Sequence, residues 1–127
     1  MIVIDANILF GLFDAGDALH DKAVRLLDTY ADDQWSTSVL TLAEFYVHPA
    51  KSNDLARAER FIADLGITSV PLLSTDAGPL ARVRADSGLK LPDAVVLWLA
   101  QSTSATLMTL DDRLVQAAVR SGVPIAC

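Results

Sequence analysis

The chain has 127 residues, of which 52% are hydrophobic and 20% charged, which suits one domain (residues 1–127) with its own buried core and excludes intrinsic disorder. The only cysteine, Cys127, excludes an intrachain disulfide, and the longest apolar run, 94–100, is too short to cross a bilayer. We therefore expect a cytoplasmic protein with no membrane association. The net charge of −6 makes the chain a poor general binder of phosphate backbones, so a nucleic-acid role requires a local site, a bound cation or a locally basic face.

The N-terminal half alternates strand patterns with helix patterns. Residues 1–4 form an apolar run that Asp5 ends, which is typical of a buried strand. Apolar residues recur at helical spacing over 18–31, and Pro49 is expected to stop the helix that begins at Val39. In chain order we predict a strand at 1–4, helices at 7–13 and 18–31, a strand at 34–38, and helices at 39–47 and 55–65.

The C-terminal half continues this alternation. Pro71 inside the run 68–73 favours an edge strand or a bulge, and Pro92 suits the first turn of a helix. The nearly all-apolar stretch 94–100 is typical of a buried helix. In chain order we predict a strand at 68–73, a helix from 76, a helix from 92 through 100, a strand at 106–110, a helix at 112–120 and a last strand at 124–126.

Strands that alternate with helices predict an α/β fold in three layers, α/β/α. The expected sheet is short and mainly parallel, with about five strands and helices on both faces. Folds of this class bind ligands beyond the carboxyl ends of their strands. The side chains at that edge are therefore the first place to look for chemistry.

Four acidic residues stand near that edge or in apolar surroundings. Asp5 and Asp111 each follow a predicted strand, and parallel strands bring their carboxyl ends to the same edge. Asp93 lies in the first turn of the buried helix, and Glu44 lies among apolar residues of another helix. We expect each carboxylate to stand where loss of hydration is costly.

Taken singly, each of these acids has an ordinary structural explanation. Asp5, Asp93 and Asp111 stand near helix starts, where a carboxylate caps a helix or complements its dipole. Glu44 would then lie on an exposed or salt-bridged helix face. Taken together, four carboxylates at one edge would repel one another, which raises their pKa values or requires a cation. Carboxylate oxygens suit Mg²⁺ and Mn²⁺, which would also supply the positive charge that a phosphate needs.

Four segments carry a resemblance to a known family, in this order and at suitable distances. They are MIVIDANIL at 1–9, LTLAEF at 40–45, LPDA at 91–94 and LMTLD at 107–111. The set covers the whole chain and resembles a PIN domain. It is most similar to the VapC-type toxin ribonucleases of type II toxin–antitoxin pairs.

The resemblance implies a metal-dependent endoribonuclease, with Mg²⁺ as cofactor and Mn²⁺ as substitute, that hydrolyses RNA phosphodiester bonds with a metal-activated water. It also implies a homodimer and a VapB-like antitoxin whose C-terminal segment enters the acidic groove. Asn7 and Thr109 match polar positions that support the site. The acidic quartet around the metal is matched by Asp5, Glu44, Asp93 and Asp111.

Some residues leave alternatives open. Asp112 directly follows Asp111, so either could be the fourth acid, and Trp98 is large for its helix in this family. Lys90 and Arg113 flank the acidic positions and are candidates for RNA contact, although solvated surface charges are the simpler explanation. The RNA target and the number of metal ions do not follow from the sequence.

Two other functions compete with this one. The first is an RNA-processing or DNA nuclease of the same fold outside a toxin pair. The second is a receiver-like signalling module, which also gathers acids and Mg²⁺ at the edge of a parallel sheet. Against the module, Asp5 is single rather than paired, and no lysine ends a late strand. The complete quartet argues against an inactive member that only binds a partner.

Overall fold

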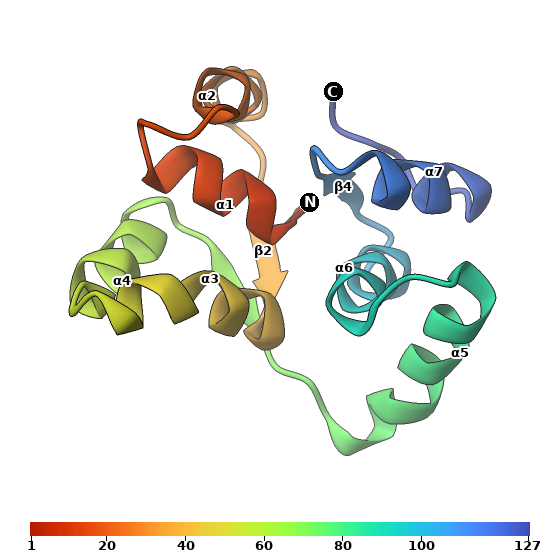
Figure 1. The fold of residues 1–127 in the computed structure, drawn as a ribbon. Helices are drawn as coiled ribbons and strands as arrows, with labels where there is room; N and C mark the ends of the chain where they lie inside the picture. The colour runs from red at the N-terminus through yellow and green to blue at the C-terminus, as the bar shows by residue number, and fades with distance from the viewer.

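A computed structural model describes all residues 1–127, with seven α-helices around a parallel sheet of four strands (Figure 1). The strands are β1 (Ile2–Ile4), β2 (Trp35–Ser38), β3 (Thr68–Val70) and β4 (Thr106–Met108). The helices are α1 (Ala6–Phe13), α2 (His20–Thr29), α3 (Val39–Lys51), α4 (Leu55–Asp64), α5 (Ala77–Ser87), α6 (Leu91–Ser102) and α7 (Asp112–Arg120), and a 3-10 turn (Ser74–Asp76) precedes α5. The predicted three-layer α/β/α fold is confirmed.

The order of the strands in the sheet is β3-β2-β1-β4. The chain adds strands in one direction from β1 to β3 and then returns to place β4 on the other side of β1. Ile2 pairs with Trp35 of β2 and with Thr106 of β4. The direction of winding therefore reverses between β1 and β4, and in open parallel sheets the crevice at such a reversal is where ligands bind.

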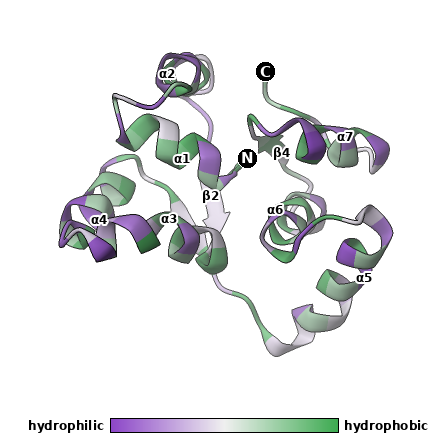
Figure 2. Cartoon of the chain, in the orientation of Figure 1, coloured by the Kyte–Doolittle hydropathy of each residue, from purple (hydrophilic) through white to green (hydrophobic).

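Side chains of β1 alternate between the two faces of the sheet and so divide the core. Ile2 and Ile4 join a cluster with residues of α1 to α4, whereas Val3 joins a second cluster with α6 and α7. Figure 2 shows α6 as a largely hydrophobic helix, and from Ala94 to Ala100 only Trp98 is not fully buried. These two clusters fix the carboxyl ends of β1 and β4 beside the starts of α1, α6 and α7.

The predicted fifth strand, at 124–126, is wrong. Only Ile125 forms a bridge, with Leu107 of β4, although Leu107 exchanges backbone hydrogen bonds with the carbonyl of Pro124 and the N–H of Ala126. Pro124 has no N–H to donate, so a ladder cannot extend through it. The strand predicted at 106–110 is also shorter than expected and ends at Met108.

One proline ends a secondary-structure element and another does not. Pro49 does not stop α3, which continues to Lys51, because its missing N–H removes only one hydrogen bond and the N–H of Ser52 still donates to the carbonyls of His48 and Pro49. Pro71, by contrast, follows directly on β3, which ends at Val70 and lies at the edge of the sheet as predicted. None of the helices has the length and apolar character needed to traverse a bilayer.

Candidate functional site

Asp5 and Asp111 lie at the reversal of strand order, after neighbouring strands. The N–H of Asp5 donates to the carbonyl of Met108, the last residue of β4, at 3.0 Å. Asp111 follows three residues later and begins α7. The prediction that both aspartates reach the same edge of the sheet is therefore confirmed by the backbone.

Asp5 is buried, with only 6% of its surface exposed, and both of its carboxylate oxygens accept hydrogen bonds. Oδ1 accepts from the N–H of Ala6 at 2.8 Å, which caps α1. Oδ2 accepts from the hydroxyl of Thr109 at 2.7 Å. These bonds fix the orientation of the carboxylate, so the capping interpretation is correct for Asp5 but describes only one of its oxygens.

Thr109 and Asn7 form the support of this carboxylate. The hydroxyl of Thr109 donates to Asp5 and accepts from Nδ2 of Asn7 at 3.3 Å and from the N–H of Asp111 at 3.1 Å. Oδ1 of Asn7 accepts from the N–H of Leu110 at 3.3 Å. One buried hydroxyl thus links two of the predicted acids with the predicted supporting residue.

Asp111 is a helix cap, as its position predicts. Its Oδ1 accepts from the N–H groups of Arg113 at 2.8 Å and Leu114 at 3.3 Å. Asp112 is the exposed first residue of α7 and makes no such contact. Of the two adjacent aspartates, Asp111 is the one whose charge acts on Asp93 and raises its pKa.

Asp93 and Glu44 are not held by hydrogen bonds or ion pairs of their own. Asp93 is half-buried in the first turn of α6, where Lys90 is the cap residue and no side chain caps the helix, so Asp93 complements the helix dipole and does not cap it. Glu44 projects from an exposed position of α3, although Phe45 beside it is fully buried. The exposed position of Glu44 matches the ordinary structural explanation, and loss of hydration nevertheless raises its pKa, as expected for this carboxylate.

Ser38 has a structural role at the start of α3 that the sequence analysis did not predict. Its hydroxyl caps α3 by accepting from the N–H of Thr41 at 3.0 Å, and the neighbouring Thr37 hydroxyl donates to the carbonyl of Ile4 at 2.8 Å. Both contacts position helix α3 and the end of β1, and so the segments that carry Glu44 and Asp5. A serine directly before an apolar helical pattern is the signal that could have identified this cap.

Burial and neighbouring carboxylates raise the pKa values of these acids. Burial raises the pKa of Asp5 to about 6, against the hydrogen bonds from Thr109 and Ala6, and the charges of Asp93 and Glu44 raise it further. Loss of hydration and then the charge of Asp93 raise the pKa of Glu44. The effects of charge require the carboxylates to be neighbours, which associates Asp5, Glu44 and Asp93 with one edge of the sheet.

Two cations act on the same site. Loss of hydration, followed by the charge of Asp111, raises the pKa of Asp93, whereas the positive charges of Lys90 and Arg113 lower it. Lys90 and Arg113 are both exposed. They therefore lie beside the acidic residues with their charged ends accessible, where the sequence predicted them.

No group of three or more acidic, histidine or cysteine side chains is close enough together to hold a metal ion as it stands. The chemistry of the donors nevertheless fits a hard divalent cation, because the four acids near this edge offer carboxylate oxygens. Three of them have raised pKa values, partly from mutual repulsion that a cation would relieve. The residues that would hold it are Asp5, Glu44, Asp93 and Asp111.

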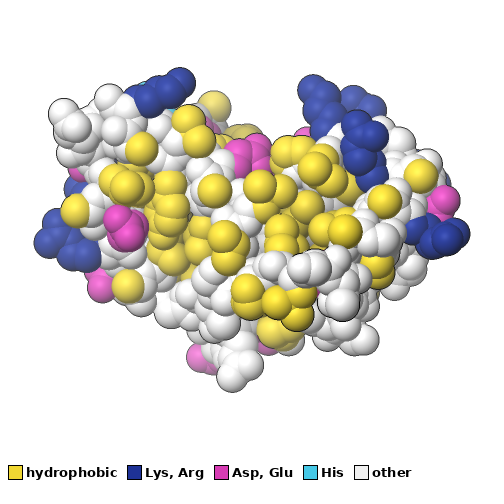
Figure 3. Space-filling view, turned by 90° about the horizontal axis from the view of Figure 1, so that it is seen from below, with side chains coloured by type: hydrophobic (Ala, Val, Ile, Leu, Met, Phe, Trp, Pro, Cys, Tyr) yellow, Lys and Arg dark blue, Asp and Glu magenta, His cyan; other side chains and the backbone are white.

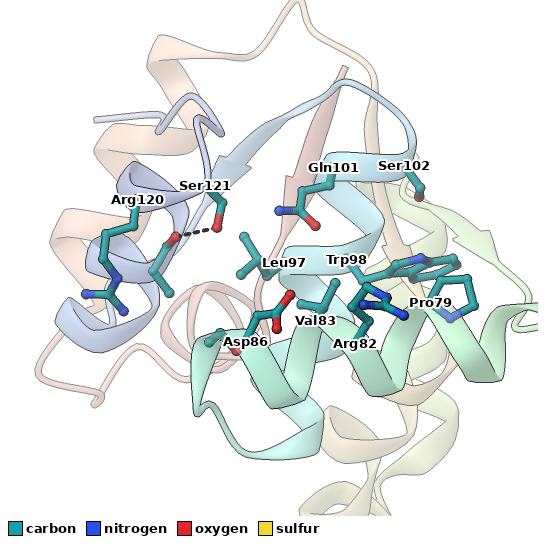
Figure 4. Close-up of a pocket in the computed structure, with 12 residues that line it drawn as sticks. Pro79, Arg82, Val83, Asp86, Leu97, Trp98, Gln101, Ser102, Arg120 and Ser121 are labelled. Carbon is teal, nitrogen blue, oxygen red and sulfur yellow. Dashed lines mark hydrogen bonds between the residues drawn. The ribbon is translucent and has the colours of Figure 1, made fainter.

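The largest hollow of the surface, about 670 Å³, lies elsewhere (Figure 4). Helices α5, α6 and the end of α7 form its walls, with Arg82 and Asp86 on one side and Arg120 on another. Trp98, the large residue noted in the sequence, is half-buried at this hollow. None of the four acids lines it, so its size does not point to the chemistry.

Comparison with known proteins gives a consistent result. The family model for the PIN domain matches residues 2–120. A toxin–antitoxin complex from Klebsiella pneumoniae contains a chain 26% identical to this one, with 87% of each chain covered and a TM-score of 0.74. No curated protein matches the chain.

Two further solved structures share the fold at lower identity. FitAcB from Neisseria gonorrhoeae is 23% identical, with 100% of this chain and 97% of that chain covered and a TM-score of 0.76. VapC20 from Mycobacterium tuberculosis, described as a toxin that cleaves the sarcin-ricin loop, is 19% identical, with 92% and 95% covered and a TM-score of 0.75. At these identities the likeness shows the fold alone.

Proposed function

Because the chain belongs to the PIN domain family, we propose that it is a metal-dependent endoribonuclease and the toxin of a VapBC-type toxin–antitoxin pair. The observation that carries the proposal is the position of Asp5 at the strand reversal, where the charges of Asp93 and Glu44 both raise its pKa. PIN domains are nucleases, so membership of the family supports a hydrolase of phosphodiester bonds. Similarity to toxin–antitoxin complexes supports the antitoxin partner.

In the proposed reaction, the four acids hold Mg²⁺ or Mn²⁺, directly or through water, with Asp111 completing the set or orienting the attacking water. When bound, the cation supplies positive charge to the scissile phosphate and lowers the pKa of water. Thr109 and Asn7 keep the carboxylate of Asp5 in one orientation. Hydrolysis adds the hydroxyl of water to phosphorus and a proton to the leaving ribose oxygen.

Lys90 and Arg113 are the cations proposed to contact the RNA backbone beside the scissile phosphate. Both act electrostatically on Asp93, and both are exposed. A chain with a net charge of −6 repels RNA at long range, so the cations next to the acids are needed to hold a phosphate there. Asp112 is proposed as a neighbour of the site rather than one of its acids, since only Asp111 acts on Asp93.

The experiment that tests the function is cleavage of total bacterial RNA by the purified protein, with and without Mg²⁺ or Mn²⁺. An Asp93→Asn variant purified identically is the control. Discrete fragments that form only with metal and only with the unsubstituted protein would support the proposal, and mapping their ends would identify the target. Equal cleavage by both proteins would mean that Asp93 is dispensable or that another nuclease is present, and no cleavage would favour a binding module.

The main alternative is a nuclease of the same fold that acts on other RNA or on DNA. Single-stranded and duplex DNA of matched length, incubated beside the RNA, distinguish these substrates. A receiver-like module would instead become phosphorylated on an aspartate by a small phosphodonor. Cleavage restricted to RNA, together with inhibition by the product of an adjacent small gene, is the outcome expected of a toxin.

A homodimer is also proposed, as the resemblance implies. Val39 and Val47 of α3 are about half exposed, at 48% and 51%, and Leu91 at the start of α6 is 47% exposed. Figure 3 shows hydrophobic side chains spread over the underside of the molecule. Light scattering of the unsubstituted protein and of a Val47→Asp variant tests this, with a monomer expected only for the variant.

A further inference from the structure

A second hollow, of about 380 Å³, lies directly beside the acidic residues. It opens between α2, the segment that leads into α7, and the C-terminal segment. Its floor is apolar and includes Leu26, Leu110, Val115 and Ile125. The site described above uses neither this hollow nor α2.

Two cations stand at its edge. Lys22 and Arg25 both line the hollow and are exposed, and their spacing of three residues puts them on the same side of α2. The only ion pair of the chain joins Arg57 to Asp54, so neither Lys22 nor Arg25 forms an ion pair with a carboxylate. Asp112 is the single acidic side chain that lines the hollow.

The hollow and the acidic site share a wall. Thr109 lines the hollow, and its hydroxyl donates to Oδ2 of Asp5 at 2.7 Å. Leu110 lines it as well, and its N–H donates to Asn7. A strand whose phosphate lies at the acids therefore has room for its next nucleotide in the hollow, with an apolar floor for ribose or base and cations for the phosphate.

The acids thus have cations on more than one side. Lys90 and Arg113 belong to the starts of α6 and α7, whereas Lys22 and Arg25 belong to α2, which lies across the start of α1 from α6 (Figure 1). Figure 3 shows acidic side chains between two groups of Lys and Arg side chains at the upper edge of that view. Cations on both sides would let a chain with a net negative charge bind RNA, since the phosphates on either side of the scissile bond would each lie near a positive charge.

We propose that Lys22 and Arg25 bind the RNA backbone next to the scissile phosphate, with the adjoining nucleotide lying in the hollow between α2 and the start of α7. The inference rests on the proposed function, because it assigns one part of the path of the substrate. Both residues bind the strand in the ground state and in the transition state, so their loss raises KM and leaves kcat unchanged.

The test measures how tightly a fluorescent single-stranded RNA binds at a series of salt concentrations. Every protein in this test also carries Asp93→Asn, so that the RNA is bound but not cleaved. Lys22→Ala/Arg25→Ala is compared with Lys51→Ala/Arg60→Ala, which removes two exposed cations from α3 and α4 and changes the net charge equally. Each lost phosphate contact is expected to reduce the slope of log K against log salt by about 0.7, which corresponds to roughly fivefold weaker binding at 0.1 M salt. The control pair is expected to bind as the parent does.

RNA cleavage by the two double variants without Asp93→Asn distinguishes failure of this inference from failure of the proposed function. A reduced slope and a raised KM for Lys22→Ala/Arg25→Ala alone would support the inference. Equal binding and equal KM for both double variants, with RNA cleavage intact, would overturn the inference and leave the proposed function standing. Absence of both RNA binding and cleavage in every protein would overturn the proposed function, and the inference with it.

Discussion

At the scale of single residues, the carboxylate of Asp5 is subject to opposing influences. Burial raises its pKa to about 6, while hydrogen bonds from Thr109 and the N–H of Ala6 favour the charged form. The folded state therefore binds the proton of Asp5 more tightly than the unfolded state, whose ordinary value is 3.8. The contribution of Asp5 to stability is greatest below pH 4 and is lost as the pH rises through 6.

The first prediction follows from this loss of stability with rising pH. Without metal, the free energy of unfolding of the unsubstituted protein should fall by roughly 2–3 kcal/mol more between pH 4 and pH 7 than that of Asp5→Asn, which imitates the protonated side chain. Urea unfolding at both pH values in the presence of a chelator measures the difference. Parallel behaviour of the two proteins would mean that the pKa of Asp5 is not raised in the folded state.

The second prediction concerns Thr109. Replacement by valine keeps the shape but removes the hydroxyl, which leaves Oδ2 of Asp5, Nδ2 of Asn7 and the N–H of Asp111 without their hydrogen-bond partner. We expect a loss of about 1–3 kcal/mol of stability and a further rise of the pKa of Asp5, because the hydroxyl favours the charged form. Carboxyl NMR titration measures the pKa, and Thr109→Ser, which retains the hydroxyl, should restore both properties.

At the scale of elements, three of the four acids stand at helix starts, and two of them cap a helix. Asp5 caps α1 and Asp111 caps α7 through their own carboxylates. A capping aspartate is held in one orientation by backbone N–H groups, which also makes it a well-positioned ligand. Capping and metal binding therefore do not exclude each other here, and different substitutions are needed to separate them.

The third prediction separates these roles at α7. Asp111→Asn keeps an oxygen that accepts from Arg113 and Leu114, whereas Asp111→Ala removes it. We expect Asp111→Ala to lower the free energy of unfolding by about 1 kcal/mol and Asp111→Asn to leave it nearly unchanged, with cleavage lost in both. Thermal melting and RNA cleavage are measured side by side. If Asp111→Asn cleaves RNA normally, Asp111 serves only as a cap.

At the scale of the whole molecule, the acidic residues belong to segments that are far apart in the chain. The sheet order β3-β2-β1-β4 brings the end of β1 beside the end of β4, and α3 and α6 lie against β2. A cation held by these segments would join both hydrophobic clusters, because Asp5 stands between them. Binding at this one place should therefore stabilise the entire fold.

The fourth prediction is that Mg²⁺ or Mn²⁺ at millimolar concentration raises the melting temperature by several degrees. A ligand at 100 times its Kd stabilises the folded state by about 2.7 kcal/mol. Asp5→Asn and Asp93→Asn should each abolish the rise, whereas Asp86→Asn, on α5 at the other hollow, should preserve it. An unchanged melting curve of the unsubstituted protein would argue against a metal site.

Much of this fold could be predicted from the spacing of apolar residues and from a few residues that end strands or helices. The apolar run before Asp5, the helical spacing of 18–31 and the helix at 112–120 all correspond to elements, and α7 has the predicted bounds. The errors occurred where a local pattern lacked long-range pairing, as at 124–126, or where a proline lay near the end of a helix, as at Pro49. Local patterns do not reveal how many hydrogen-bonding partners a segment will find.

The sequence by itself determined which residues are the candidates for the chemistry, because acids that follow strands or interrupt apolar helices are chemically conspicuous and resemble an ordered family pattern. Only the tertiary structure decided what each acid contacts. Asp5 is buried and accepts two hydrogen bonds, and Asp111 caps a helix, whereas the side chain of Asp93 makes no hydrogen bond and Glu44 is exposed. It also placed Lys22 and Arg25 in the same hollow as Thr109, which follows Arg25 by 84 residues in the chain. Burial, mutual repulsion and the path of a substrate depend on distances through space, which strand order and packing set and which spacing along the chain does not contain.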